Sequence, residues 1–283
     1  MRNKFKYFLI LILLFSLASA EDFNCFTILA GKNATQSGSV LLAHNEDDYG
    51  QQMVNFYKVK SREFTKNDSI TLKNGVRLPQ KENRNAYVWL QIPGLDFSDS
   101  YFNNQGVVIA SDGCRSREDQ DDLTDGGIGY WLRRVMAERA SSARQAVKIG
   151  GRLVEKYGYY SSGRSYCVAD TAEAWIMAVV KGRRWIARRI PDDHVAVIPN
   201  FYTIQNINLD DTLNYLASDD IISYAKQRGW YDPEVDGKFN FRQVYGAGLD
   251  HPSNINRMGR GVNLLSEKQY KIDAETKFPF SFK

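Results

Sequence analysis

A pair of helical segments set within a long series of strand-like segments is the feature that most constrains the fold of this chain. The helical spacing of apolar residues covers 129–139 and 143–156, and Ser141 and Ser142 precede the second segment as candidate N-caps. Gly158 follows this segment, as expected of a glycine just beyond a helix C-terminus. Apolar or alternating runs predict strands at 26–30, 39–43, 54–60, 86–92, 107–111, 165–169, 174–180, 185–188 and 195–198. Strands followed by helices and then more strands favour an α+β fold with antiparallel sheets over repeated βαβ units.

The first two predicted strands form a hairpin across the turn-rich residues 31–38, and a further helix is expected at 219–228. Residues 67–85 are polar and read as a loop. We find no repeat or linker, so residues 25–283 are expected to form one domain with a substantial core.

The N-terminus has the pattern of a secretory signal peptide over residues 1–20. A basic region with Arg2, Lys4 and Lys6 precedes the apolar residues 8–17, and Ala18-Ser19-Ala20 forms a small-x-small cleavage site. The apolar stretch is short for a membrane-spanning helix, which makes an uncleaved anchor the weaker alternative. We therefore expect a protein exported to the periplasm or the outside of the cell, with no stable membrane association after cleavage.

The charge of the chain gives no indication of a nucleic-acid partner. The full sequence has a net charge of +4, but three of its 37 basic residues lie within residues 1–20, which contain no acidic residue. Without this segment 34 basic residues face 33 acidic ones, a net charge of +1. The basic patch typical of nucleic-acid-binding proteins is therefore not expected.

The three cysteines of the chain are Cys25, Cys114 and Cys167. An odd number in an exported protein indicates a free reactive thiol or an intermolecular disulfide. If Cys25 is the free thiol, Cys114 and Cys167 could pair, which the sequence leaves open. The cysteine spacing matches no metal-ligand pattern and the three histidines are scattered, so we expect no metal and no cofactor.

Cys25 lies five residues beyond the predicted signal cleavage site. If residues 21–24 are removed as a short propeptide, Cys25 carries both a thiol and a free α-amine. The amine has an ordinary pKa of roughly 8, so it can accept the thiol proton without a histidine.

Three polar clusters accompany this cysteine. The first, at residues 44–48, contains His44 and Asp47 and follows the second strand of the hairpin, which returns beside Cys25. The second is Asn200, just after an apolar strand, and the third surrounds Arg257. Each would be an ordinary turn or surface segment by itself; their combination with Cys25 favours a catalytic site.

As a linked set, these motifs closely resemble the C69 dipeptidases, which are cysteine N-terminal-nucleophile hydrolases. The family is related to the secernins and, more remotely, to choloylglycine hydrolases and penicillin V acylases. The resemblance runs from Cys25 to the C-terminus and is carried by residues 25–35 (CFTILAGKNAT), 37–40 (SGSV), 45–47 (NED), 132–140 (LRRVMAERA), 143–147 (ARQAV), 170–175 (DTAEAW), 185–193 (WIARRIPDD) and 198–200 (IPN).

The resemblance implies a four-layer αββα sandwich and the hydrolysis of linear amide bonds, with a small peptide or amide as substrate. It assigns Cys25 as the nucleophile and Asp47 as the carboxylate that contacts the α-amine. Asn200 matches the asparagine that holds the oxyanion, and Arg257 matches a late arginine of the wider superfamily. His44 occupies a position that is often arginine in relatives, so a titratable charge replaces a permanent one.

The chain also ends at residue 283, where longer family members continue, so the C-terminal half of those members is expected to be absent and the fold incomplete there. Three hypotheses follow. The first is a secreted cysteine dipeptidase whose propeptide is removed autocatalytically, and the second is an acyl-amide hydrolase of the same chemistry. The third is an exported binding protein of the same fold with impaired catalysis. A homo-oligomer is a further partner hypothesis.

Overall fold

A computed structural model describes residues 25–47, 54–91 and 98–267 of the chain. Its largest element is an eight-stranded sheet in the order β15-β13-β12-β11-β10-β9-β8-β3, in which all neighbours are antiparallel. Its strands are β3 (Asn55–Val59), β8 (Tyr87–Gln91), β9 (Ser98–Asn103), β10 (Val108–Gly113), β11 (Tyr159–Ala169), β12 (Ala174–Gly182), β13 (Trp185–Ile190) and β15 (Tyr215–Ala217).

A second antiparallel sheet has three strands in the order β14-β1-β2. They are β1 (Phe26–Ala30), β2 (Leu41–Asn45) and β14 (Val195–Ile198). The short helix η1 (Lys32–Ala34) begins the connection between β1 and β2. Before it, Gly31 lies so close to the loop after β13 that a Cβ would be 2.4 Å from the carbonyl oxygens of Pro191 and Asp192. Only glycine fits at this position.

Six α-helices lie in the described part of the chain. They are α2 (Trp131–Arg139), α3 (Ala143–Tyr157), α4 (Ile221–Gln227), α5 (Pro233–Asp236), α6 (Phe241–Tyr245) and α7 (Pro252–Glu267). The start of α3 is capped by Ser142, whose hydroxyl accepts a 3.2 Å hydrogen bond from the Gln145 amide. Gly158 follows the last residue of the helix with a φ of 75°. A residue with a Cβ would be strained in this left-handed conformation, whereas glycine is not.

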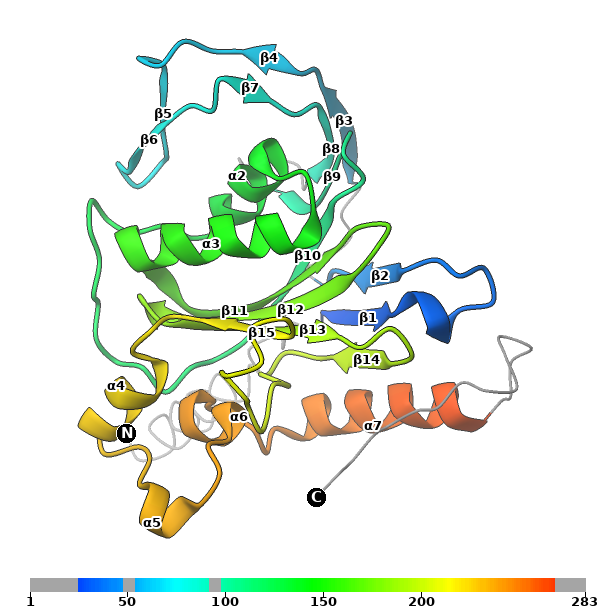
Figure 1. Cartoon of the computed structure of the whole chain (residues 1–283), viewed down its shortest axis with the longest axis vertical. Helices are drawn as coiled ribbons and strands as arrows, with labels where there is room; N and C mark the ends of the chain where they lie inside the picture. Colours follow the sequence, from blue (N-terminus) through cyan, green and yellow to red (C-terminus); the bar gives the residue numbers. More distant parts are fainter. Residues whose placement is uncertain (1–24, 48–53, 92–97, 268–283) are drawn as a thin grey trace, which may run out of the picture.

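The two sheets and the helices form four layers, as Figure 1 shows: α2 and α3, then the large sheet, then β1, β2 and β14, and finally α7. Successive residues of β11 point alternately to the two faces of the large sheet, one covered by α2 and α3 and the other by the small sheet. Tyr166 and Val168 join the core beneath α2 and α3, whereas Cys167 and Ala169 join the core shared with β1 and β14. Alternation along a strand thus gives the large sheet an apolar residue on both faces.

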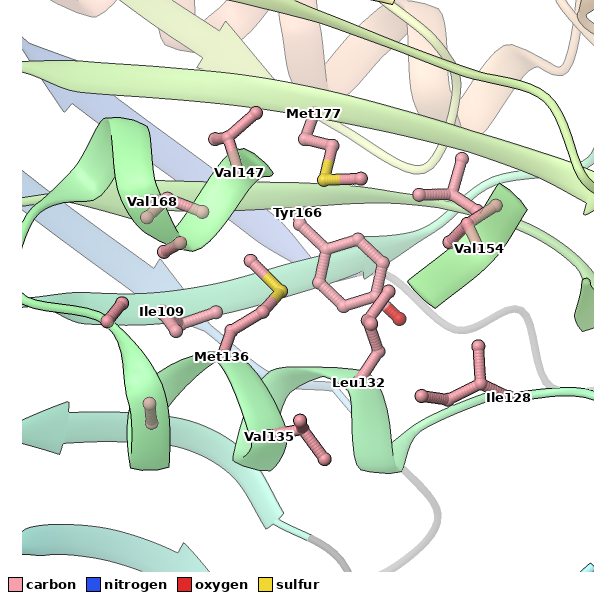
Figure 2. Packing of buried hydrophobic residues seen from close by; sticks show 14 of the residues in the cluster. Ile109, Ile128, Leu132, Val135, Met136, Val147, Val154, Tyr166, Val168 and Met177 are labelled. Atoms are coloured by element: carbon pink, nitrogen blue, oxygen red, sulfur yellow. The ribbon is translucent and has the colours of Figure 1, made fainter. Parts of the chain in front are cut away.

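The core between the helices and the large sheet is well filled by large side chains. Figure 2 shows Leu132 and Met136 of α2 directed toward Tyr166 and Met177 of the sheet. Each of these four residues is fully buried. On the outer face of the small sheet, α7 approaches so closely that a Cβ on Gly261 would lie 2.7 Å from the Phe26 ring.

The α+β class and the four-layer αββα arrangement predicted from the sequence are confirmed. The hairpin, the helix pair with its caps and the helix near 219–228 are also found, with ends shifted by a few residues. The loop prediction for 67–85 was wrong in part, because it contains β5 (Ser69–Thr71) and β6 (Arg77–Pro79), which pair, and β7 (Asn83–Arg84), which pairs with β4 (Arg62–Glu63). These strands are short and polar, so they carry little of the alternation that marks a strand.

The signal peptide and propeptide predicted at residues 1–24 lie outside the described residues. Within residues 25–47, 54–91 and 98–267, none of the helices combines the length and apolar character required to span a bilayer.

Candidate active site around Cys25

The small sheet places Cys25 level with two of the predicted polar clusters. Thr27 in β1 pairs with Ile198 in β14 and with His44 in β2. Continuing both registers to the end of β1 sets Cys25 between Asn200 and Glu46. Hydrogen bonds from Arg257 to Cys25 and Asn200, and the 3.5 Å contact of the Cys25 sulfur with Glu46 Oε1, hold these three residues together just beyond the paired positions.

The thiol of Cys25 is 4% exposed and faces the segment that follows β2. Its sulfur lies 3.5 Å from Glu46 Oε1 and 3.9 Å from the backbone carbonyl oxygen of Asp47. Burial and, to a smaller extent, the carboxylates of Glu46 and Asp112 together raise the pKa of this thiol to about 12, against a lowering by the hydrogen bond to the Asp47 backbone and by the charge of Arg164. With Cys25 in its peptide linkage, the thiol is therefore neutral at ordinary pH.

The predicted arginine of the third cluster contacts Cys25 directly. Arg257 lies in α7, and its Nη1 donates a 2.6 Å hydrogen bond to the carbonyl oxygen of Cys25. Its Nη2 donates to the Oδ1 atoms of Asn200 at 3.1 Å and Asn254 at 2.6 Å. One planar guanidinium thus joins the start of β1 to the residue just beyond β14.

Two hydrogen bonds fix the side-chain amide of Asn200. Its Oδ1 accepts from Arg257, and its Nδ2 donates to the carbonyl oxygen of Gly113 at 3.0 Å. Since a guanidinium only donates and a carbonyl only accepts, this orientation of the amide is the one consistent with both partners. The Nδ2 group carries a second N–H, which is the kind of donor an oxyanion requires.

His44 is held between two carboxylates in the space between the sheets. Its Nδ1 is 2.7 Å from Thr27 Oγ1 and its Nε2 is 3.2 Å from Glu46 Oε2. The hydroxyl of Thr27 donates its single proton to Asp112 Oδ2 at 2.7 Å. If both carboxylates are ionised, Thr27 accepts from Nδ1–H of His44 and Nε2–H donates to Glu46, and the ring is then an imidazolium. His44 can therefore provide the positive charge that arginine would supply at this position.

The predicted site residues Cys25, His44, Asn200 and Arg257 thus come together, and Asp47 lies beside them. Asp47 contacts the thiol through its backbone carbonyl. The role predicted for its carboxylate, toward a free α-amine of Cys25, stays a prediction because that nitrogen is part of a peptide bond in the complete chain.

Sequence reasoning missed three residues of this site as individuals. Glu46 was noted only as part of the cluster at 44–48, although its spacing of two from His44 predicts that both side chains point to the same face of β2. Asp112 and Arg164 lie in β10 and β11, each directly beside a predicted strand (107–111 and 165–169), and the signal that could have found them is a charged residue adjoining an apolar run.

All three cysteines are free thiols, so the suggested Cys114–Cys167 disulfide is not formed. The Cys114 sulfur lies 3.2 Å from Ser165 Oγ, and that of Cys167 lies 3.7 Å from Asp112 Oδ2. Among the described residues, His, Cys, Asp and Glu side chains form no group of three or more that could hold a metal ion.

Comparison with known proteins gives a match over nearly the whole chain. The profile of Peptidase family C69 matches residues 24–283. A probable dipeptidase from Latilactobacillus sakei is 27% identical over 243 residues, which cover 82% of this chain and 50% of that protein. Dipeptidase A from Lactobacillus helveticus is 26% identical over 249 residues, covering 82% and 51% of the two chains. The chain therefore spans about half the length of the curated relatives it matches.

Solved structures with similar backbones are more distant. Penicillin V acylase from Agrobacterium tumefaciens has a TM-score of 0.44 and 11% identity, covering 75% of this chain and 58% of its own. A variant of conjugated bile acid hydrolase from Clostridium perfringens has a TM-score of 0.43 and 13% identity, covering 90% and 74%. Because these TM-scores are below 0.5, the sequence profile alone carries the family assignment.

Proposed function

Because the chain belongs to peptidase family C69, we propose that it is an exported cysteine hydrolase of linear amide bonds, with dipeptides as its preferred substrates. Cys25 is the nucleophile in this proposal, and its α-amine is the base. The curated relatives named as dipeptidases are about twice as long as the region matched here, so the activity of this chain is inferred from its own site.

The observation that carries the proposal is the row formed by Asn200, Cys25 and Glu46, with Arg257 bonded to both Cys25 and Asn200. A buried cysteine that only filled space would need no such set of charged and amide groups around it. Their presence supports a reacting thiol with a donor on one side and an acceptor on the other.

Activation requires removal of the residues before Cys25. In the proposed step the Cys25 sulfur attacks the carbonyl carbon of Asn24, and the peptide nitrogen of Cys25 leaves as its α-amine, which gives a thioester. Water then hydrolyses the thioester and releases the preceding segment with a new carboxyl end. Glu46 Oε1, 3.5 Å from the sulfur, accepts the thiol proton in this step and passes it to the leaving nitrogen.

The freed amine changes the electrostatics of the thiol. In the uncleaved chain, burial and Glu46 keep the pKa of the thiol at about 12. An α-ammonium group on the same residue adds a positive charge that lowers the pKa of the thiol. The neutral amine has an ordinary pKa of roughly 8, close to the ordinary pKa of a cysteine thiol, so it can accept the thiol proton. Asp47 then orients the amine.

In each turnover the thiolate attacks the amide carbonyl of the substrate, and the unused N–H of Asn200 donates to the developing oxyanion. The α-ammonium protonates the leaving amine, and water hydrolyses the acyl-enzyme. One oxyanion donor contributes about 3–4 kcal/mol to such a reaction.

The test combines N-terminal sequencing with kinetics on the exported protein. We expect a mature chain that begins at Cys25 and hydrolyses dipeptides. Cys25→Ala should retain the preceding residues and lose at least about a thousandfold in kcat. Cys114→Ala, which removes a buried thiol elsewhere, is the matched control and should remain active. A fully active chain that keeps residues 21–24 would refute the mechanism.

A substrate panel separates the related hypotheses. Faster hydrolysis of N-acyl amino acids than of dipeptides would support the acyl-amide hydrolase. No hydrolysis of either, together with slow alkylation of Cys25 in the mature chain, would support a catalytically impaired binding protein.

A further inference from the structure

Arg164 lies beside the proposed site with an unusual set of partners. It stands in β11 directly opposite Gly113 of β10. Its Nη1 donates to Ser111 Oγ at 3.0 Å, and its guanidinium carbon lies 4.7 Å from the centre of the Tyr130 ring. Among the described residues its Nε is buried and has no hydrogen-bond partner.

These contacts leave the charge of Arg164 without a matching anion. Within the part of the chain that the structure describes, no carboxylate forms an ion pair with it, although Glu46 acts on it through space. A partly buried cation that contacts only a hydroxyl, a backbone carbonyl and an aromatic ring has lost hydration without full compensation. The arrangement is one that an anionic ligand would complete.

Gly113 leaves room for such a ligand beside this arginine. The position that a Cβ on Gly113 would take has two heavy atoms within 4 Å among the described residues, Arg164 Nη2 and Asn200 Nδ2, each at 3.8 Å. Both are nitrogen donors. The missing side chain therefore creates a small cradle with N–H groups on two sides.

The cradle adjoins the reacting thiol. Asn200 is level with Cys25 in the sheet and shares Arg257 with it. The positive charge of Arg164 also lowers the pKa of the Cys25 thiol.

We infer that Arg164 binds the free carboxylate of the substrate residue that leaves as the amine. In a dipeptide this carboxylate is separated from the scissile carbonyl by one nitrogen and one Cα, so a group near the thiol and the oxyanion donor is suitably placed for it. The planar guanidinium matches a carboxylate in geometry as well as charge. The inference rests on the proposed function and adds to it the recognition of a carboxyl end.

The experiment compares a dipeptide with its C-terminal amide, which has the same scissile bond and no negative charge. For wild type we expect kcat/KM for the free acid to exceed that for the amide by about 10- to 100-fold. Arg164→Met should remove this preference by raising KM for the free acid. Any effect of the lost charge on the thiol falls equally on both substrates, so the ratio of their kcat/KM values reports carboxylate binding alone. Arg164→Lys should retain part of the preference, because lysine keeps the positive charge but lacks the paired N–H donors with which a guanidinium binds both oxygens of a carboxylate.

A second variant tests the cradle without removing a polar group. Gly113→Ala places a methyl group 3.8 Å from both donors, an ordinary contact distance that the fold tolerates. We expect it to raise KM for the free acid more than for the amide. Arg183→Met, which removes an arginine paired with Asp122 away from the site, should leave the preference for the free acid unchanged.

The outcomes separate this inference from the proposed function. Equal losses on both substrates in Arg164→Met, or no preference in wild type, would overturn the inference while hydrolysis itself persists. If wild type hydrolyses neither substrate, the proposed function fails. In that case calorimetry measures the affinity of the inactive protein for the dipeptide free acid and for its amide. The inference stands only if the free acid binds more tightly than the amide and Arg164→Met removes this difference in affinity.

Discussion

Arg257 donates a 2.6 Å hydrogen bond to the carbonyl oxygen of Cys25, a residue 232 positions earlier in the chain. The same guanidinium reaches Asn200 at 3.1 Å. Helix α7 therefore completes the site from outside the small sheet. A residue that holds the start of β1 in this way also holds Cys25, the proposed nucleophile, because Cys25 immediately precedes that strand.

This relationship predicts the effect of replacing Arg257 with lysine. A single ammonium group cannot bond Cys25 and Asn200 in the same geometry, so Arg257→Lys should lower kcat/KM for a dipeptide by about 10- to 100-fold. Arg260→Lys, at an exposed position of the same helix, is the control and should change the rate little. Similar rates for the two variants would show that Arg257 does not position the site.

Asn200 should act chiefly on kcat. Asn200→Ala removes the proposed oxyanion donor and should lower kcat by about 100- to 1,000-fold with a small change in KM. Asn256→Ala, at an exposed position on α7, provides the comparison. A rise in KM with unchanged kcat would assign Asn200 to substrate binding instead.

The imidazolium form of His44 predicts that charge matters more than shape at this position. His44→Gln keeps hydrogen-bonding capacity but removes the cation that faces Glu46 and Asp112, so kcat/KM should fall by about tenfold or more. His44→Arg should retain more of the activity. Steady-state kinetics of both variants provide the measurement, and the reverse order of activities would contradict the assignment of charge.

The buried thiol of Cys114 predicts a loss of stability in alkali. Burial raises its pKa from 9.0 to about 12, so the folded chain keeps a proton that the unfolded chain releases above pH 9. The stability contributed by this group is complete below pH 9 and is lost as the pH rises toward 12.

Urea unfolding of wild type and Cys114→Ala between pH 8 and pH 11 measures this effect. The difference in unfolding free energy between the two should be constant up to about pH 9 and then shrink by about 1.4 kcal/mol per pH unit. A difference that stays constant across the range would show that folding does not raise the pKa of this thiol.

Local patterns in the sequence determined much of the fold. The apolar periodicity and the caps of 143–156 predicted α3 within one residue at its end, because Ser142 and Gly158 act on neighbouring backbone groups. The hairpin of β1 and β2 followed from two apolar runs and a turn, which also predicted that His44 and the residues just after it lie near Cys25. Helix α7 was missed, since Arg257 and its neighbours read as a basic surface turn.

Tertiary structure alone decided how the site is assembled. The pairing of β14 with β1 crosses more than half of the chain and sets Asn200 level with Cys25, and no local pattern encodes a register over that distance. The contact of the two sheets brings Asp112 to Thr27, and the pairing of β10 with β11 sets Arg164 opposite Gly113. The sequence by itself therefore determined most strands of the two sheets, the helix pair of α2 and α3, and that Cys25 begins a hairpin. The burial of both faces of the large sheet, by α2 and α3 on one side and the small sheet on the other, decided which distant charges surround that cysteine.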